Sequence, residues 1–123
     1  MPVDRLRYEE PHPISRDEAL SAFATNQPEV ICSTLVAIAL HDSDWRWAQD
    51  KCLELARHPD AAVRQIAATC IGHVARIHRR LDLDAVTPVL NQLVSDTEVY
   101  VKGCAEDAMH DIQTFMGVDL KGK

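Results

Sequence analysis

One segment of the chain repeats after 38 residues, and this repeat restricts the possible folds more than any other feature. The segment is HPDAAVRQIAATCIGHVARIHRR, residues 58–80. A forward shift of 38 residues pairs apolar residues with apolar residues along the chain: Val63 with Val101, Ala67 with Ala105, Val74 with Ile112, Ala48 with Val86, and Cys52 with Leu90. A period of this length that contains two apolar helical stripes is typical of an α-solenoid, whose hairpins bury their apolar faces by stacking.

The segments within the repeat carry helix signals. Only 4 glycines and 6 prolines interrupt 123 residues, which favours helices over a fold with many turns. A capping box from Ser15 to Glu18 opens a short helix that should end near Thr25, and Gly117 is a natural end for the last helix. These signals divide the chain into three parts: an arm at 1–14, an all-α domain at 15–117 and a flexible tail at 118–123.

Residues 30–40 form an apolar run that contains nothing more polar than Cys, Ser and Thr. Such a run is compatible with a buried strand. The first-turn position of Pro28, the alanine content and the helical neighbours favour a helix buried on most sides. The run would also suit a dimer interface, so we expect a monomer or a weak dimer.

The repeated segments resemble the HEAT-repeat family and the related armadillo-type solenoids. In the second helix of a HEAT hairpin, Asp-Pro is followed at set spacings by Val-Arg, Ala and a small or apolar residue. The matching residues are Pro59, Val63, Arg64, Ala67 and Cys70 in one copy, and Asp96, Val101, Lys102, Ala105 and Ala108 in the next. The resemblance implies a short right-handed α-solenoid of about three HEAT-like hairpins (six helices). It also implies that Arg64 and Lys102 join polar contacts between neighbouring repeats.

The formal charge of the chain is −6, from 19 acidic and 13 basic side chains. Phosphate binding needs a cationic surface, so nucleic acid is not an expected partner. A basic protein is a better partner, because opposite charges accelerate encounter. The polar start MPVDRLRYEE has neither a signal peptide nor a membrane span, and the four cysteines form no CxxC pair. We expect a cytoplasmic protein with reduced thiols and no membrane partner.

No residue pattern indicates a catalytic site, a metal site or a cofactor. The histidines lack the spacing of a zinc-binding helix, and HDSD at 41–44 lies where a helix must be capped. Cys52, Cys70 and Cys104 fall on apolar stripes, where a thiol packs as a small hydrophobic side chain. Glycine-rich phosphate loops and GxSxG elbows are absent from the sequence. The sequence therefore predicts a protein that is not an enzyme.

The second helices of the two clear repeats differ in charge. Arg76 and Arg79 project opposite the apolar stripe and form a basic cluster with His78 and Arg80. Such a cluster is also typical of a solvated helix C-terminus, here one that faces the acidic LDLD stretch. Trp47 stands off the stripe of its helix and is either an interface anchor or covered by the N-terminal arm. The candidate partner-binding residues are Glu106, Asp107, His110, Asp111, Trp47, Arg76 and Arg79.

The resemblance and the charge pattern together predict a non-catalytic protein-binding module. Small HEAT-like chains occur among the immunity proteins of bacterial polymorphic toxin systems, and this chain resembles them in size and architecture. The resemblance implies an immunity protein that neutralises a cognate toxin, with Glu106, Asp107 and Asp111 blocking a basic active cleft. Two alternatives stay open, namely a structural or assembly adaptor of a cytosolic complex and a nucleic-acid-binding HEAT protein.

Overall fold

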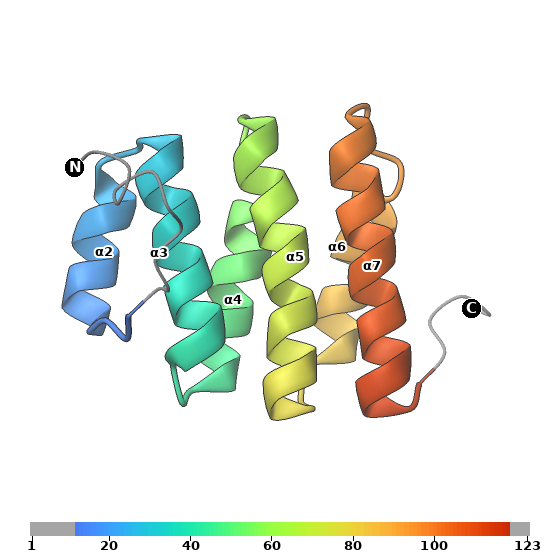
Figure 1. Ribbon diagram of the computed structural model, residues 1–123. Coiled ribbons are helices and arrows are strands. Elements are labelled where there is room, and N and C mark those ends of the chain that lie inside the picture. The colour runs from blue at the N-terminus through green and yellow to red at the C-terminus, as the bar shows by residue number, and fades with distance from the viewer. Residues whose placement is uncertain (1–11, 119–123) are drawn as a thin grey trace, which may run out of the picture.

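The computed structural model describes residues 12–118, which form six α-helices joined by short turns (Figure 1). The helices are α2 (Arg16–Ala24), α3 (Pro28–His41), α4 (Trp45–Leu55), α5 (Ala61–His78), α6 (Leu83–Leu93) and α7 (Val99–Met116). These residues contain no strand, so the all-α prediction is confirmed and residues 30–40 are helical. Most of the expected arm and nearly all of the expected tail lie outside the described residues.

The helices pair into three hairpins, α2–α3, α4–α5 and α6–α7, that stack side by side (Figure 1). Helices α3, α5 and α7 form one layer, which we call the second-helix layer, and α4 and α6 lie behind it. Helix α5 packs against α3, α4 and α7, whereas α2 and α7 lie at opposite ends of the stack. This arrangement confirms the predicted short α-solenoid.

Local capping explains where several helices begin. At the start of α2, Ser15 Oγ accepts a 3.1 Å hydrogen bond from the Glu18 backbone N–H, and Glu18 Oε1 accepts a 2.9 Å bond from the Ser15 backbone N–H. This is the capping box expected from the sequence. Asp44 caps α4 and Asp60 caps α5 through backbone N–H groups of the first turn.

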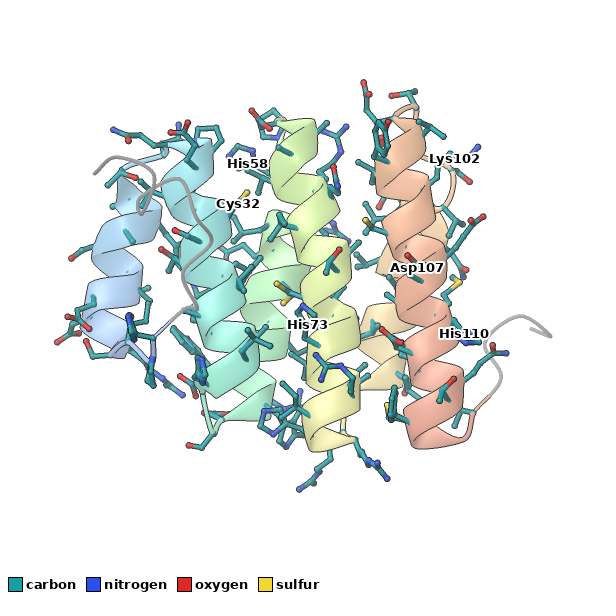
Figure 2. The ribbon with its side chains drawn as sticks, in the orientation of Figure 1. Cys32, His58, His73, Lys102, Asp107 and His110 are labelled. Atoms are coloured by element: carbon teal, nitrogen blue, oxygen red, sulfur yellow. The ribbon has the colours of Figure 1, made fainter. Side chains whose placement is uncertain are left out.

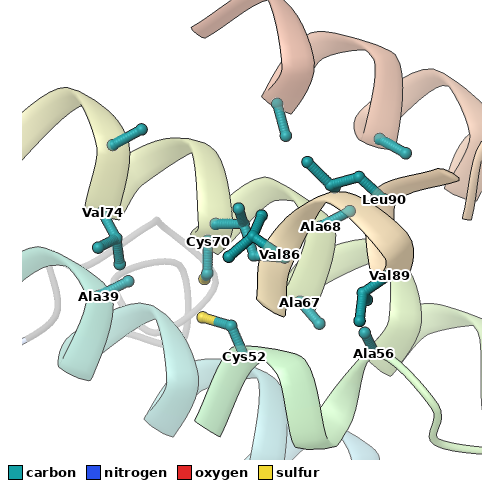
Figure 3. Close-up of a cluster of buried hydrophobic side chains, with 14 of the residues drawn as sticks. Ala39, Cys52, Ala56, Ala67, Ala68, Cys70, Val74, Val86, Val89 and Leu90 are labelled. Carbon is teal, nitrogen blue, oxygen red and sulfur yellow. The ribbon is translucent and has the colours of Figure 1, made fainter. Parts of the chain in front are cut away.

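Small side chains allow α5 to be buried on most of its surface. Ala67 and Ala68 are fully buried and belong to the same apolar cluster as Leu90 of α6 (Figure 3). The thiols of Cys52 and Cys70 face one another in the same core (Figure 3). Contact with the Cys52 thiol, together with burial, raises the pKa of Cys70 well above its usual range. The Cys70 thiol therefore stays protonated and packs as a hydrophobic side chain.

A bidentate ion pair ties the second hairpin to the third. Arg64 of α5 donates from Nε to Asp96 Oδ2 at 2.9 Å and from Nη2 to Asp96 Oδ1 at 3.2 Å. Its Nη1 donates to the carbonyls of His58 and Pro59 at 3.0 and 2.9 Å. These bonds confirm the inter-repeat role that the HEAT resemblance implies for Arg64. Lys102 at the equivalent position is exposed on α7, the last helix of the described chain, where no following hairpin meets it.

A buried glutamine makes a second polar contact between the same two hairpins. Gln49 of α4 is fully buried, and its Oε1 accepts a 2.6 Å hydrogen bond from the backbone N–H of Asp82, the residue before α6. Its Nε2 donates to Asp50 Oδ1 at 3.1 Å. Because both ends of the amide are satisfied, burial of Gln49 fixes the α5–α6 connection against α4.

Candidate protein-binding surface

The candidate residues of α7 divide between two faces of that helix. Asp107 lies on the second-helix layer, whereas His110 points toward the open end of the solenoid (Figure 2). Helical spacing of four residues places Asp111 on the face of Asp107 and Glu106 on the face of His110. Glu106, Asp107 and His110 are exposed and Asp111 is half-buried. The sequence predicted that all four point outward, with Asp107 and Asp111 to one flank of Glu106 and His110, and Asp111 is less exposed than expected.

Asp111 reaches toward α5 because Gly72 leaves room for it. A Cβ atom added at Gly72 would lie 2.6 Å from Asp111 Oδ2, so the Asp111 carboxylate would have to move to make room for it. At the next residue of α5, burial and the nearby Arg76 guanidinium lower the pKa of His73, while Asp111 acts in the opposite direction. Neutral His73 accepts a hydrogen bond at Nδ1 from Arg76 Nη2, at 2.9 Å. Arg76, His73 and Asp111 therefore form a polar strip between α5 and α7.

Two large apolar side chains at the start of α7 are exposed, and the sequence argument missed them. Tyr100 is 73% exposed and Val99 is 68% exposed. The 38-residue shift places Ala61 and Ala62 at the equivalent positions of α5. The change from two alanines to a valine and a tyrosine is the signal that could have identified this pair. Exposed tyrosines are favoured at protein interfaces.

Trp47 is covered by another helix. It is half-buried and packs against the core, and the Arg16 guanidinium of α2 lies 4.5 Å from the centroid of its ring. Arg16 also forms an ion pair with Asp44, the cap of α4. The structure thus places Trp47 in a contact between the first two hairpins.

The basic cluster at the end of α5 packs on aromatic rings. The Arg79 guanidinium lies 5.6 Å from the centroid of Phe115, and the Arg80 guanidinium lies 5.2 Å from that of Trp45. Asp82 of the acidic LDLD stretch instead pairs with Arg46, at 3.4 Å. Arg76 and Arg79 are exposed, as the sequence predicts.

Arg79 and Arg80 border a groove with a volume of ≈570 Å³. The residues that line it are Trp45, Arg46, Arg79, Arg80, Leu81, Asp82, Leu83, Asp84 and Met116. Among residues 12–118, no group of three or more His, Cys, Asp and Glu side chains could hold a metal ion. No helix in this part of the chain is both long and apolar enough to cross a bilayer.

Stacked helical hairpins joined by an Arg64–Asp96 ion pair define an α-solenoid repeat protein. The HEAT-repeat family profile matches residues 49–78, which cover most of α4 and all of α5. The chain belongs to the HEAT-repeat family.

A solved chain in the crystal structure of a CDI complex from Cupriavidus taiwanensis LMG 19424 is similar to this protein. The two chains are 32% identical, with a TM-score of 0.78, and the likeness covers 89% of this chain and 96% of that one. Among curated proteins, none matches the chain.

Proposed function

We propose that the protein is an immunity protein that binds a cognate toxin and neutralises it by covering the active site. The observation that carries this proposal is the likeness to a chain of a CDI complex, which extends over 96% of that chain at 32% identity. A CDI complex belongs to a toxin–immunity system. The protein would act in the bacterial cytoplasm as a binding module, with no catalytic step of its own.

We assign the toxin-facing surface to the second-helix layer at α7. Tyr100 and Asp107 are seven residues apart and therefore share one face of the helix, with Asp111 close by. This face combines an exposed aromatic side chain with two carboxylates, which suits a basic cleft in the partner. Glu106 extends the acidic surface toward the end of the solenoid. Tyr100, rather than the covered Trp47, supplies the aromatic anchor.

Protection of cells against the toxin tests this surface. We expect the variant E106K/D107K/D111N to lose protection, because two positive charges would face a basic cleft and a third carboxylate would be neutral. Asn is used at position 111 because the side chain there lies close to Gly72. The variant should keep the helical circular dichroism of the wild type.

The control variant D17K/E29K/D50N changes the formal charge by the same amount on α2, α3 and α4. All three of these carboxylates are exposed. We expect this control to protect as well as the wild type. Full protection by E106K/D107K/D111N would contradict the assignment of the α7 surface.

A further inference from the structure

The groove at the C-terminal end of α5 is distinct from the α7 surface assigned above, since no residue lines both. Its apolar lining includes Trp45, Leu83 and Met116, which also pack against the core. The rest of the lining holds the three guanidinium groups of Arg46, Arg79 and Arg80 and the two carboxylates of Asp82 and Asp84. The groove therefore carries excess positive charge, although the formal charge of the whole protein is −6.

The guanidinium groups of Arg79 and Arg80 contact aromatic rings and are not neutralised by a carboxylate of residues 12–118. The Arg79 guanidinium lies over the Phe115 ring and the Arg80 guanidinium over the Trp45 ring, and neither makes an ion pair within the described residues. A guanidinium that stacks through its face keeps its edge N–H groups free to donate. Stacking also reduces the entropy that the side chain loses when a ligand binds. Both arginines are thus prepared to bind carboxylates.

The backbone at Arg79 adds a second observation. Arg79 ends α5 in the left-handed conformation, with φ 55° and ψ 32°. The other described residues with positive φ are Asn26 and Gly117, and both residue types adopt this conformation readily. Arginine does so at a cost in stability, and such a cost is often retained at functional sites. Glycine at this position would remove the cost, together with the guanidinium.

We propose that this groove binds an acidic, amphipathic segment of a partner protein. Carboxylates of the segment pair with Arg79 and Arg80, and its apolar side chains cover Leu83 and Met116. A nucleic acid fits less well, because Asp82 and Asp84 would repel a continuous run of phosphates. In addition, Arg46 and Arg80 already lie 4.9 and 5.2 Å from the Trp45 ring centroid, where a base would have to stack. The proposal does not require the partner to be a toxin.

Fluorescence anisotropy of a fluorescein-labelled peptide of alternating Glu and Leu, measured at low salt, tests the groove directly. We expect saturable binding with a dissociation constant below about 1 mM. Arg79→Gly and Arg80→Gln should each weaken binding at least about fivefold, because each variant removes a charge-assisted pair. Arg57→Gln is the control, since Arg57 is exposed and lies outside the groove, and it should bind like the wild type.

Thermal unfolding of the same variants separates binding from folding. Arg79→Gly should unfold at or above the wild-type temperature, because glycine suits the left-handed conformation.

In a Trp47→Phe background, Trp45 is the one remaining tryptophan, and its emission should change as the peptide binds.

Three results would overturn the proposal. The first is no saturable peptide binding to the wild type. The second is unchanged binding in both arginine variants. The third is tighter binding of a single-stranded oligonucleotide of equal charge than of the peptide.

Discussion

At the scale of single residues, Trp47 and Tyr100 have opposite environments although both are aromatic. Trp47 is half-buried and lies beneath the Arg16 guanidinium, while Tyr100 is 73% exposed. A side chain that is already packed in the free protein contributes mainly to folding. An exposed aromatic side chain gains its burial when a partner binds. The two residues therefore allow stability and binding to be tested separately.

We expect Trp47→Ala to lower the free energy of unfolding by about 2 kcal/mol, less than the roughly 3–5 kcal/mol typical of a fully buried tryptophan. The affinity of the Trp47→Ala variant for the toxin should stay close to that of the wild type. Tyr100→Ala should change stability by less than about 0.5 kcal/mol and weaken toxin binding at least about tenfold. Denaturant unfolding and calorimetric titration measure the two effects. The reverse pattern would restore Trp47 as the interface anchor.

At the scale of helices, the Arg64–Asp96 pair is the main polar connection between the second and third hairpins. The two side chains are only 18% and 11% exposed, and the pair is bidentate. Hydrogen bonds from Arg64, with a further one from the Glu98 backbone N–H, hold the pKa of Asp96 below its usual value. The folded state therefore favours the ionised carboxylate. The resulting stability is present above the ordinary pKa of aspartate and is lost as the pH falls through the lowered value.

We expect Asp96→Asn to lower the free energy of unfolding by about 1–3 kcal/mol near pH 7, because it removes a charge-assisted bidentate pair. The difference in free energy of unfolding between Asp96→Asn and the wild type should shrink as the pH falls below about 4. Denaturant unfolding at a series of pH values measures this. Lys102→Ala is the control and should be neutral within about 0.5 kcal/mol. A difference that stays constant between neutral and strongly acidic pH would show that the carboxylate charge is not involved.

The helices were predictable from the sequence because their signals are local. The apolar stripe of each helix, the Ser15–Glu18 capping box and the terminal Gly117 each depend on residues close together in the chain, and the 38-residue shift shows that such stripes recur. The environments of individual side chains were less predictable because they depend on neighbouring helices. Arg16 of α2 covers Trp47, and the lack of a side chain at Gly72 leaves room for Asp111 beside α5. Neither contact leaves a periodic pattern in the sequence.

The candidate surface was predicted in part for the same reason. The sequence identified the exposed acids of α7, since charged residues opposite an apolar stripe must face outward. It did not predict that Arg79 and Arg80 stack on Phe115 and Trp45, because those rings come from α7 and α4. Long-range pairing of this kind becomes visible only in the folded molecule.

At the scale of the whole molecule, the solenoid separates surfaces of opposite charge on one scaffold. The acids of α7 and the arginines at the end of α5 belong to adjacent helices that pack closely at Gly72, where an added Cβ atom would lie 3.4 Å from Ala108 Cα. Stacked hairpins with buried polar ties hold such surfaces in a fixed relation. A partner would therefore have to match both signs of charge at defined positions, which favours one cognate protein over many.

The most direct test of the immunity proposal begins with capture of this protein, together with its partner, from its native cell. The growth of cells that express the captured partner is then measured. The account predicts one stoichiometric partner that arrests growth when expressed alone, with growth restored when this protein is co-expressed. A partner that does not impair growth, or a toxic partner whose effect co-expression fails to relieve, would contradict it. A set of non-toxic subunits would instead favour an assembly adaptor.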